Sequence, residues 1–198
     1  MTHTSLSEYV TQYLDGLKKI IDEMPADKIE SMGEILFQAY RHNKQVFIFG
    51  NGGSAATASH MACDLGKNTI GPNRPRFRVM SLNDNMPLLS ALANDVGYDR
   101  VFAEQLVNLV RPGDVLIAIS GSGRSPNIIE AMRYARERAA TVIALLGFDG
   151  GEAIELADEY VLVPSSEYGP IEDLHMILDH ILTGYFAERL EQHELATA

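Results

Sequence analysis

Two segments rich in glycine and serine hold the residues best suited to chemistry. The first is Gly50-Asn51-Gly52-Gly53-Ser54, and the second is Ser120-Gly121-Ser122-Gly123-Arg124-Ser125-Pro126. Glycine allows a backbone to approach a ligand closely, and the N–H groups at the start of a helix attract anions. Serine hydroxyls add donors, and a hydrogen bond to a charged group contributes roughly 1.5–3 kcal/mol. The two segments therefore predict an anion site that needs no lysine, and Arg124 is either a lid for the anion or a solvated loop charge.

Histidines and acids form a second set of candidate residues. His60 and Asp64 are four residues apart on an expected helix and share a face. Glu172 and His180 are eight residues apart, about two turns, and could also point to one side. Two imidazoles and two carboxylates suit zinc or a similar divalent ion, and they also suit acid–base catalysis. His175 is interpreted either as a packing residue or as a catalytic one.

Five short apolar runs alternate with helical patterns along the chain. Their residues are 45–49, 77–82, 115–119, 142–146 and 160–163. Such an alternation predicts an α/β fold with a five-stranded parallel sheet between two layers of helices, a three-layer α-β-α sandwich. Each glycine-rich segment directly follows a strand, and open parallel sheets bind ligands beyond the carboxyl ends of their strands. The predicted fold thus places both segments at the edge where ligands bind.

Helices are also expected at both ends of the sequence. Apolar residues three and four apart predict helices over residues 5–24 and 27–42, separated by Pro25, and a long helix over 171–190. The length of 198 residues predicts a single domain over 1–198. Within it, residues 1–43 are predicted to form a helical pair that packs on the domain or between subunits.

Composition narrows the possible partners and the compartment. The net charge of −11 argues against nucleic acid and anionic membranes as partners. Cys63 is the only cysteine, so no intrachain disulfide can form. Neither a signal peptide nor a stretch of about 20 apolar residues is present. These features predict a cytoplasmic location.

Two nucleotide-binding patterns fit the sequence poorly. The P-loop pattern G-x-x-x-x-G-K-[ST] is absent. Gly50 to Ala55 match the alanine-ended dinucleotide fingerprint, but no acid lies between Asp64 and Asp84, where the ribose contact is expected. A phosphosugar is therefore the expected anion.

Four motifs in order resemble a known family over nearly the whole chain. They are the first glycine segment, Ala93-Asn94-Asp95, the S-x-S-G-x-S pattern of residues 120–125, and a final helix with His175 and His180. Together they resemble the sugar isomerase (SIS) domain family, and within it the phosphoheptose isomerases. The resemblance implies a flavodoxin-like sheet, a homotetramer with active sites between subunits, and a divalent metal, usually zinc.

The resemblance also implies roles for individual residues. Asp64 would be the catalytic base and His180 the acid, and the metal ligands would be His60, Asp64, Glu172 and His180. The implied substrate contacts are Asn51, Gly52, Gly53, Ser54, Asp95, Ser120, Gly121, Ser122, Ser125 and Glu172. The chain departs from the family at four positions, where glutamate, glutamine, aspartate and threonine are replaced by Asp64, Glu172, Gly169 and Gly121.

Three functions follow as hypotheses. The first is an aldose–ketose isomerase that converts sedoheptulose 7-phosphate to D-glycero-D-manno-heptose 7-phosphate through an enediol. The second is a non-catalytic SIS protein that binds a phosphosugar or a protein, as the DnaA initiator-associating members do. The third is an isomerase, or another enzyme, of a different phosphosugar, to which the departures at Asp64, Glu172 and Gly169 point.

Overall fold

The computed structural model describes the backbone of residues 5–197 and the side chains of residues 5–192. Residues 1–4 of the predicted helical pair lie outside the described residues. The elements follow one another as α1 (Leu6–Asp22), α2 (Ala26–Arg41), β1 (Gln45–Gly50), α3 (Gly53–Asn68), β2 (Arg78–Ser81), α4 (Met86–Asp95), a 3-10 turn η1 (Tyr98–Arg100), α5 (Ala103–Leu109), β3 (Val115–Ser120), α6 (Pro126–Glu137), β4 (Thr141–Leu146), α7 (Ala153–Leu156), β5 (Glu159–Leu162) and α8 (Tyr168–Thr197).

The five strands form one parallel sheet in the order β2-β1-β3-β4-β5. This is the flavodoxin-like order, in which the chain reverses its direction of travel between β1 and β3. The predicted fold class is therefore confirmed. Gly50 pairs with Ile119, so the two glycine-rich loops leave the sheet side by side at this switch point.

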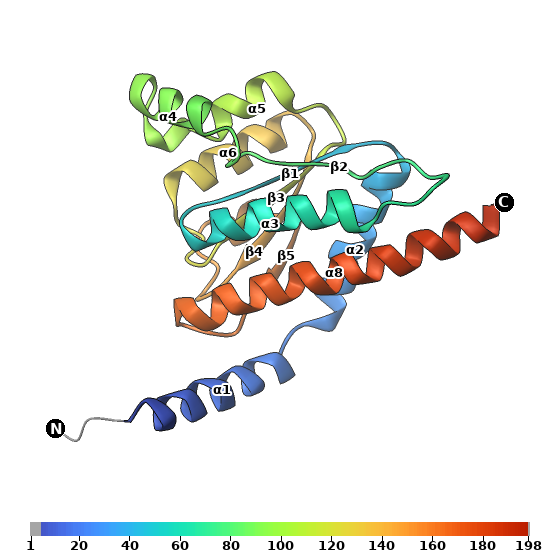
Figure 1. Ribbon diagram of the computed structural model, residues 1–198. Coiled ribbons are helices and arrows are strands. Elements are labelled where there is room, and N and C mark those ends of the chain that lie inside the picture. Colours follow the sequence, from blue (N-terminus) through green and yellow to red (C-terminus); the bar gives the residue numbers. More distant parts are fainter. Residues whose placement is uncertain (1–4, 198) are drawn as a thin grey trace.

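Alternating strand residues divide the core into two halves. Ile48 and Ile117 pack with α2, α3 and α8 on one face of the sheet, whereas Phe49 and Ala118 pack with α5 and α6 on the other. These layers are visible in Figure 1, with α3 drawn in front of the strands and α8 below them, and with α4, α5 and α6 above. Successive strand side chains point to opposite faces, which is why nearly continuous apolar runs produce a sheet covered on both sides.

Two helices project from this sandwich. α1 lies apart from the sheet and packs near the start of α8 and the segment before it, and the end of α8 extends beyond the body of the molecule (Figure 1). The final helix begins at Tyr168, three residues earlier than predicted. No helix among the described residues has the length and apolar character needed to cross a membrane.

Candidate functional site

The two glycine-rich loops and the start of α8 enclose a small pocket at the switch point. Its volume is about 240 Å³, and it is lined by Asn51, Gly52, Gly53, Ser54, Ile119, Ser120, Gly121, Ser122, Ser125, Tyr168 and Glu172. Every predicted substrate contact except Asp95 is in this lining. The parallel register of β1 and β3 brings together loops that are about seventy residues apart in the sequence.

The serines of the second loop keep donors for a ligand. The Ser120 Oγ accepts a hydrogen bond from the Gly123 N–H at 3.1 Å, and the Ser122 Oγ accepts one from the Arg124 N–H at 3.3 Å. Because both oxygens act as acceptors within the loop, their O–H groups remain to donate elsewhere. Ser125 is the N-cap of α6, as predicted, yet its side chain makes no capping hydrogen bond. All three hydroxyls can therefore donate to an anion in the pocket.

Arg124 is directed away from the pocket. Its guanidinium donates to both carboxylate oxygens of Asp149, at 2.7 and 2.5 Å. Hydrogen bonds from Arg124, together with the Gly151 N–H, lower the pKa of Asp149 to about 2. Of the two interpretations left open by the sequence, the structure shows a paired loop charge.

Glu172 belongs to α8, and its carboxylate lies inside the pocket beside the start of α3. A Cβ placed on Gly53 would be 2.5 Å from the Glu172 Oε2, so glycine leaves the space that the carboxylate occupies. A carboxylate at a helix N-terminus is favoured by the helix dipole. The group of possible metal ligands that this chain brings together does not include Glu172, and residues eight apart on a helix are separated by about 12 Å along its axis. Within one chain, Glu172 and His180 therefore lie at different places on α8.

The other three predicted ligands come together where α3 packs along α8. The His60 Nε2 lies 3.2 Å from the His180 Nε2 and 3.4 Å from the Asp64 Oδ2. The fourth member of this group is Asp179, and the ligand atoms of all four lie within 4.8 Å of one another. Nitrogen and oxygen ligands at about 2.05 Å from a tetrahedral ion are separated by about 3.3 Å. The His60–Asp64–His180 arrangement fits a divalent cation.

Asp179 differs from its neighbours in burial. Its side chain is 0% exposed, whereas that of His60 is 46% exposed. The Thr183 hydroxyl donates to one carboxylate oxygen at 3.2 Å, and the other oxygen, Oδ2, has no hydrogen-bond partner. Burial, and then the charge of Asp64, raise the pKa of Asp179. No local pattern in the sequence points to Asp179, because its partner His60 is on a distant segment.

A polar network supports the first loop. Asn51 and Asn127 exchange two amide hydrogen bonds, each 2.9 Å long, and the Tyr98 hydroxyl donates to the Asn51 Oδ1 at 3.0 Å. Asn127 is buried in the first turn of α6. The only local signal for Asn127 is weak: a polar residue that directly follows the helix-starting Pro126. These bonds fix the Asn51 side chain at the mouth of the pocket.

Two other predicted positions lie outside the pocket. Asp95 is exposed at the end of α4, where its carboxylate accepts a hydrogen bond from Asn94. Gly169 faces α1, and a Cβ there would be 2.9 Å from the Tyr13 hydroxyl, which donates to Asp173 at 2.5 Å. The Tyr13–Asp173 contact thus occupies the space that a side chain at position 169 would need.

His175 is a packing residue in this structure. It is fully buried, its Nε2 lies 3.2 Å from the Leu146 carbonyl oxygen, and its Nδ1 has no partner. Burial lowers its pKa to about 4. The imidazole is therefore neutral at pH 7 and joins α8 to the end of β4.

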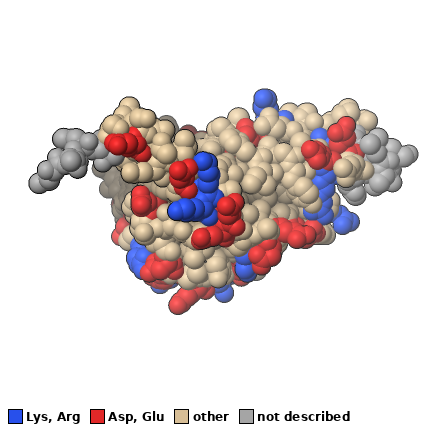
Figure 2. Space-filling view, turned by 90° about the horizontal axis from the view of Figure 1, so that it is seen from below, with Lys and Arg blue, Asp and Glu red and all other residues tan. Residues whose placement is uncertain are grey.

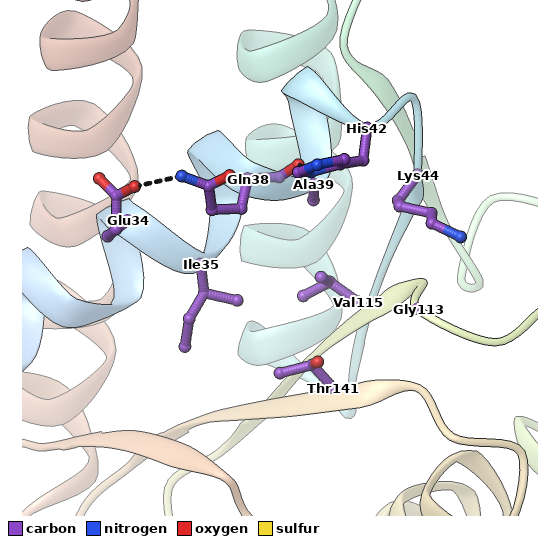
Figure 3. Close-up of a pocket in the computed structure, with 9 residues that line it drawn as sticks. All are labelled: Glu34, Ile35, Gln38, Ala39, His42, Lys44, Gly113, Val115 and Thr141. Atoms are coloured by element: carbon purple, nitrogen blue, oxygen red, sulfur yellow. Dashed lines mark hydrogen bonds between the residues drawn. The ribbon is translucent and has the colours of Figure 1, made fainter.

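A further hollow lies at the opposite end of the sheet. Its volume is about 330 Å³, and its lining includes Glu34 and Gln38 of α2 and the starts of β3 and β4 at Val115 and Thr141. Figure 3 shows the Gln38 amide directed at Glu34 rather than into the hollow. No group of metal-ligating residues accompanies it in the described part of the chain. The candidate site is therefore the glycine–serine pocket with the neighbouring His–Asp group.

An open parallel sheet with this pocket at its switch point defines an α/β protein that binds an anionic small molecule. The sequence profile of the SIS domain matches residues 8–147. The chain belongs to the SIS domain family. It is 40% identical to phosphoheptose isomerase from Sulfurimonas denitrificans over 156 residues, 79% of this chain and 80% of that protein. It is 39% identical to phosphoheptose isomerase from Mycobacterium tuberculosis, over 85% of this chain and 86% of that protein.

Solved structures agree with these matches. Phosphoheptose isomerase from Neisseria gonorrhoeae superposes with a TM-score of 0.86 at 31% identity, covering 93% of this chain and 100% of that one. The enzyme from Francisella tularensis has a TM-score of 0.87 at 24% identity and supports the likeness of fold. Fold and family predicted from the sequence are thus confirmed.

Proposed function

We propose that the protein is an aldose–ketose isomerase that converts sedoheptulose 7-phosphate to D-glycero-D-manno-heptose 7-phosphate. The observation that carries the proposal is the placement of a phosphate-type pocket and a His–Asp group on the same pair of helices, α3 and α8. Relatives named phosphoheptose isomerase, 40% and 39% identical, support the substrate. Gly53 and His60 are seven residues apart, so the two parts of the site are separated by about 10 Å along α3.

The pocket would bind the phosphate. The hydroxyls of Ser120, Ser122 and Ser125 would donate to its oxygens, and the start of α6, where Ser125 is the N-cap, would supply a favourable dipole. Asn51, Ser54, Glu172 and Asp95 remain proposed sugar contacts. The exposed position of Asp95 suits a site completed by a neighbouring subunit.

The proton transfers would be carried out by Asp64 and His180. Asp64 takes the proton from C1 of the ketose while the C1–H electron pair forms the C1–C2 double bond, and His180 gives a proton to the carbonyl oxygen on C2. The enediol then collapses: the proton on Asp64 returns to C2, and the O1 proton passes to His180. The product is the aldose, and both residues recover their starting protonation states.

His60, Asp64 and His180 would also hold a divalent metal, with zinc as the expected ion. When bound, such an ion polarises the carbonyl and stabilises charge on its oxygen. The donor set fits, because imidazole and carboxylate are ordinary zinc ligands. We further propose a homotetramer in the cytoplasm.

The test is an isomerase assay with sedoheptulose 7-phosphate and ketose phosphates of five to seven carbons, with and without zinc. We expect Asp64→Asn and His180→Ala each to lose about 100-fold or more in kcat, whereas Asp22→Asn, an exposed change at the end of α1, keeps full activity. Turnover of another phosphosugar alone would overturn the assigned substrate. Tight phosphosugar binding without turnover in any metal state would instead favour the non-catalytic binding protein.

A further inference from the structure

Asp179 has an unsatisfied carboxylate that faces the His–Asp group. Its Oδ2 is buried, has no hydrogen-bond partner, and lies 3.8 Å from the His60 Nε2. Transfer of a carboxylate from water without a compensating partner is costly. A cation between these groups would satisfy the oxygen.

The geometry around His60 favours such a cation over a direct contact. The Nε2 atom of His60 faces three ligand atoms: the His180 Nε2, the Asp64 Oδ2 and the Asp179 Oδ2, at 3.2, 3.4 and 3.8 Å. One imidazole nitrogen carries at most one proton, so it can donate to only one of them. A divalent ion can bind all four ligand atoms at once. The three separations from the His60 Nε2 bracket the value of about 3.3 Å for a tetrahedral site, and all four ligand atoms lie within 4.8 Å of one another.

Asp179 and His180 reach this point from different sides of α8. Consecutive helix residues do not face each other, and here Asp179 is buried while His180 is exposed. The Thr183 hydroxyl holds the other carboxylate oxygen of Asp179, as partners outside the ligand shell commonly orient metal ligands. The buried carboxylate would form the inner wall of the site and leave the outer side open to substrate.

We propose that Asp179 is the fourth metal ligand that this chain supplies, completing a site of two imidazoles and two carboxylates with His60, Asp64 and His180. The two carboxylates balance the charge of a divalent ion. This inference rests on the metal site of the proposed function. Its test measures metal binding without sugar, so the assignment of Asp179 as a ligand and the proposed isomerase activity can fail independently.

The first experiment titrates zinc by calorimetry and cobalt by visible absorption into wild type, Asp179→Asn and Asp173→Asn. Asp173 lies six residues earlier on α8. Its carboxylate accepts a hydrogen bond from the Tyr13 hydroxyl and is not a member of the His–Asp group. We expect Asp179→Asn to weaken metal binding by 10-fold to 100-fold or more and to change the cobalt spectrum, while Asp173→Asn changes neither. Wild-type affinity and spectrum in a folded Asp179→Asn protein would overturn the proposal.

A second variant gives a positive signal and guards against loss of folding. Asp179→Cys, made together with Cys63→Ser, places a thiol at the proposed ligand position, and a cobalt-bound thiolate gives a near-ultraviolet charge-transfer band that cobalt bound by imidazole and carboxylate lacks. Cys63→Ser alone is the control, because Cys63 is exposed beside Asp64. The band in the double variant alone supports direct contact with the metal. Its absence in a folded protein that binds cobalt overturns the proposal.

Discussion

At the scale of single residues, two histidines of α8 have opposite environments. His180 is exposed and faces His60 across the α3–α8 contact, whereas His175 is enclosed by the core and directed at the end of β4. Five residues separate them, which corresponds to a rotation of about 140° around the helix axis. The difference in burial therefore places His180 in the candidate site and His175 in the core.

The buried His175 should make the protein sensitive to acid. Its pKa is about 4 when folded, against about 6.5 when unfolded. Between these values the unfolded chain binds the additional proton, so stability is lost as the pH falls below 6.5. The full effect is about 3 kcal/mol. The test compares the free energy of unfolding at pH 7 and pH 4 in wild type and in His175→Gln, whose side chain cannot titrate but can donate to the Leu146 carbonyl oxygen. Between these pH values, wild type should lose about 3 kcal/mol more than the variant. Equal losses in both proteins would contradict the assignment.

At the scale of elements, backbone hydrogen bonds join the loop after β3 to the loop after β4. The Gly147 N–H donates to the Gly121 carbonyl oxygen at 2.9 Å, and the Ala153 N–H donates to the Gly123 carbonyl oxygen at 3.0 Å. Gly123 has a φ of 62°, and a Cβ there would lie 2.0 Å from the Gly150 carbonyl oxygen. The pocket thus depends on the loop after β4, residues 147–152, which supplies none of the predicted substrate contacts.

Two glycine substitutions separate steric clash from backbone strain. Gly52 also has a positive φ, 55°, but open space surrounds the Cβ position. Gly52→Ala should therefore cost only the backbone strain of this sparsely populated conformation (φ 55°, ψ −123°), about 1–3 kcal/mol. Gly123→Ala adds overpacking against backbone, about 1–3 kcal/mol more, and should be the less stable protein in thermal or denaturant unfolding. Equal stabilities would show that the two loops can move apart freely.

At the scale of the whole molecule, α1 exposes an apolar face. Leu6, Tyr9, Val10, Leu14 and Ile21 are all exposed, and no residue of α1 is buried. Part of the same apolar stripe contacts the body, because residues three, four and seven apart share a helix face. There, Leu17 and Ile20 pack near Ile171, and the Tyr13 hydroxyl donates to Asp173. The face seen in Figure 2 also combines broad uncharged areas with interspersed acidic and basic groups. A contiguous apolar stripe such as that of α1 is typical of a subunit interface.

Changing this face should change the oligomeric state. Wild type should elute at a multiple of the 21.8 kDa chain mass, and we expect four chains. Val10→Lys with Leu14→Lys should lower the mass measured by light scattering, because a lysine is costly to bury in an interface. Lys19→Glu, on the exposed polar face of the same helix, is the control and should keep the wild-type mass. A monomeric wild type at micromolar concentration would contradict the predicted subunit packing.

The sequence by itself determined the sheet and the pocket. Apolar runs and glycine-rich segments are local patterns, and an open parallel sheet has few ways to arrange strands that alternate with helices. Knowing that β1 and β3 are neighbours is enough to place Asn51 and Ser120 together. The pairing of His60 with Asp64 was equally local, because four residues correspond to about one helical turn.

Only the tertiary structure decided the contacts between helices. Whether Glu172 or Asp179 joins His60 depends on how α8 is shifted and rotated against α3, and a shift of two turns exchanges one residue for the other. The Asn51–Asn127 pair and the Tyr13–Asp173 contact at Gly169 likewise join distant segments. Spacing along a helix fixes which residues share a face, but packing between helices fixes which of them meet a partner, and that requires the positions of both helices.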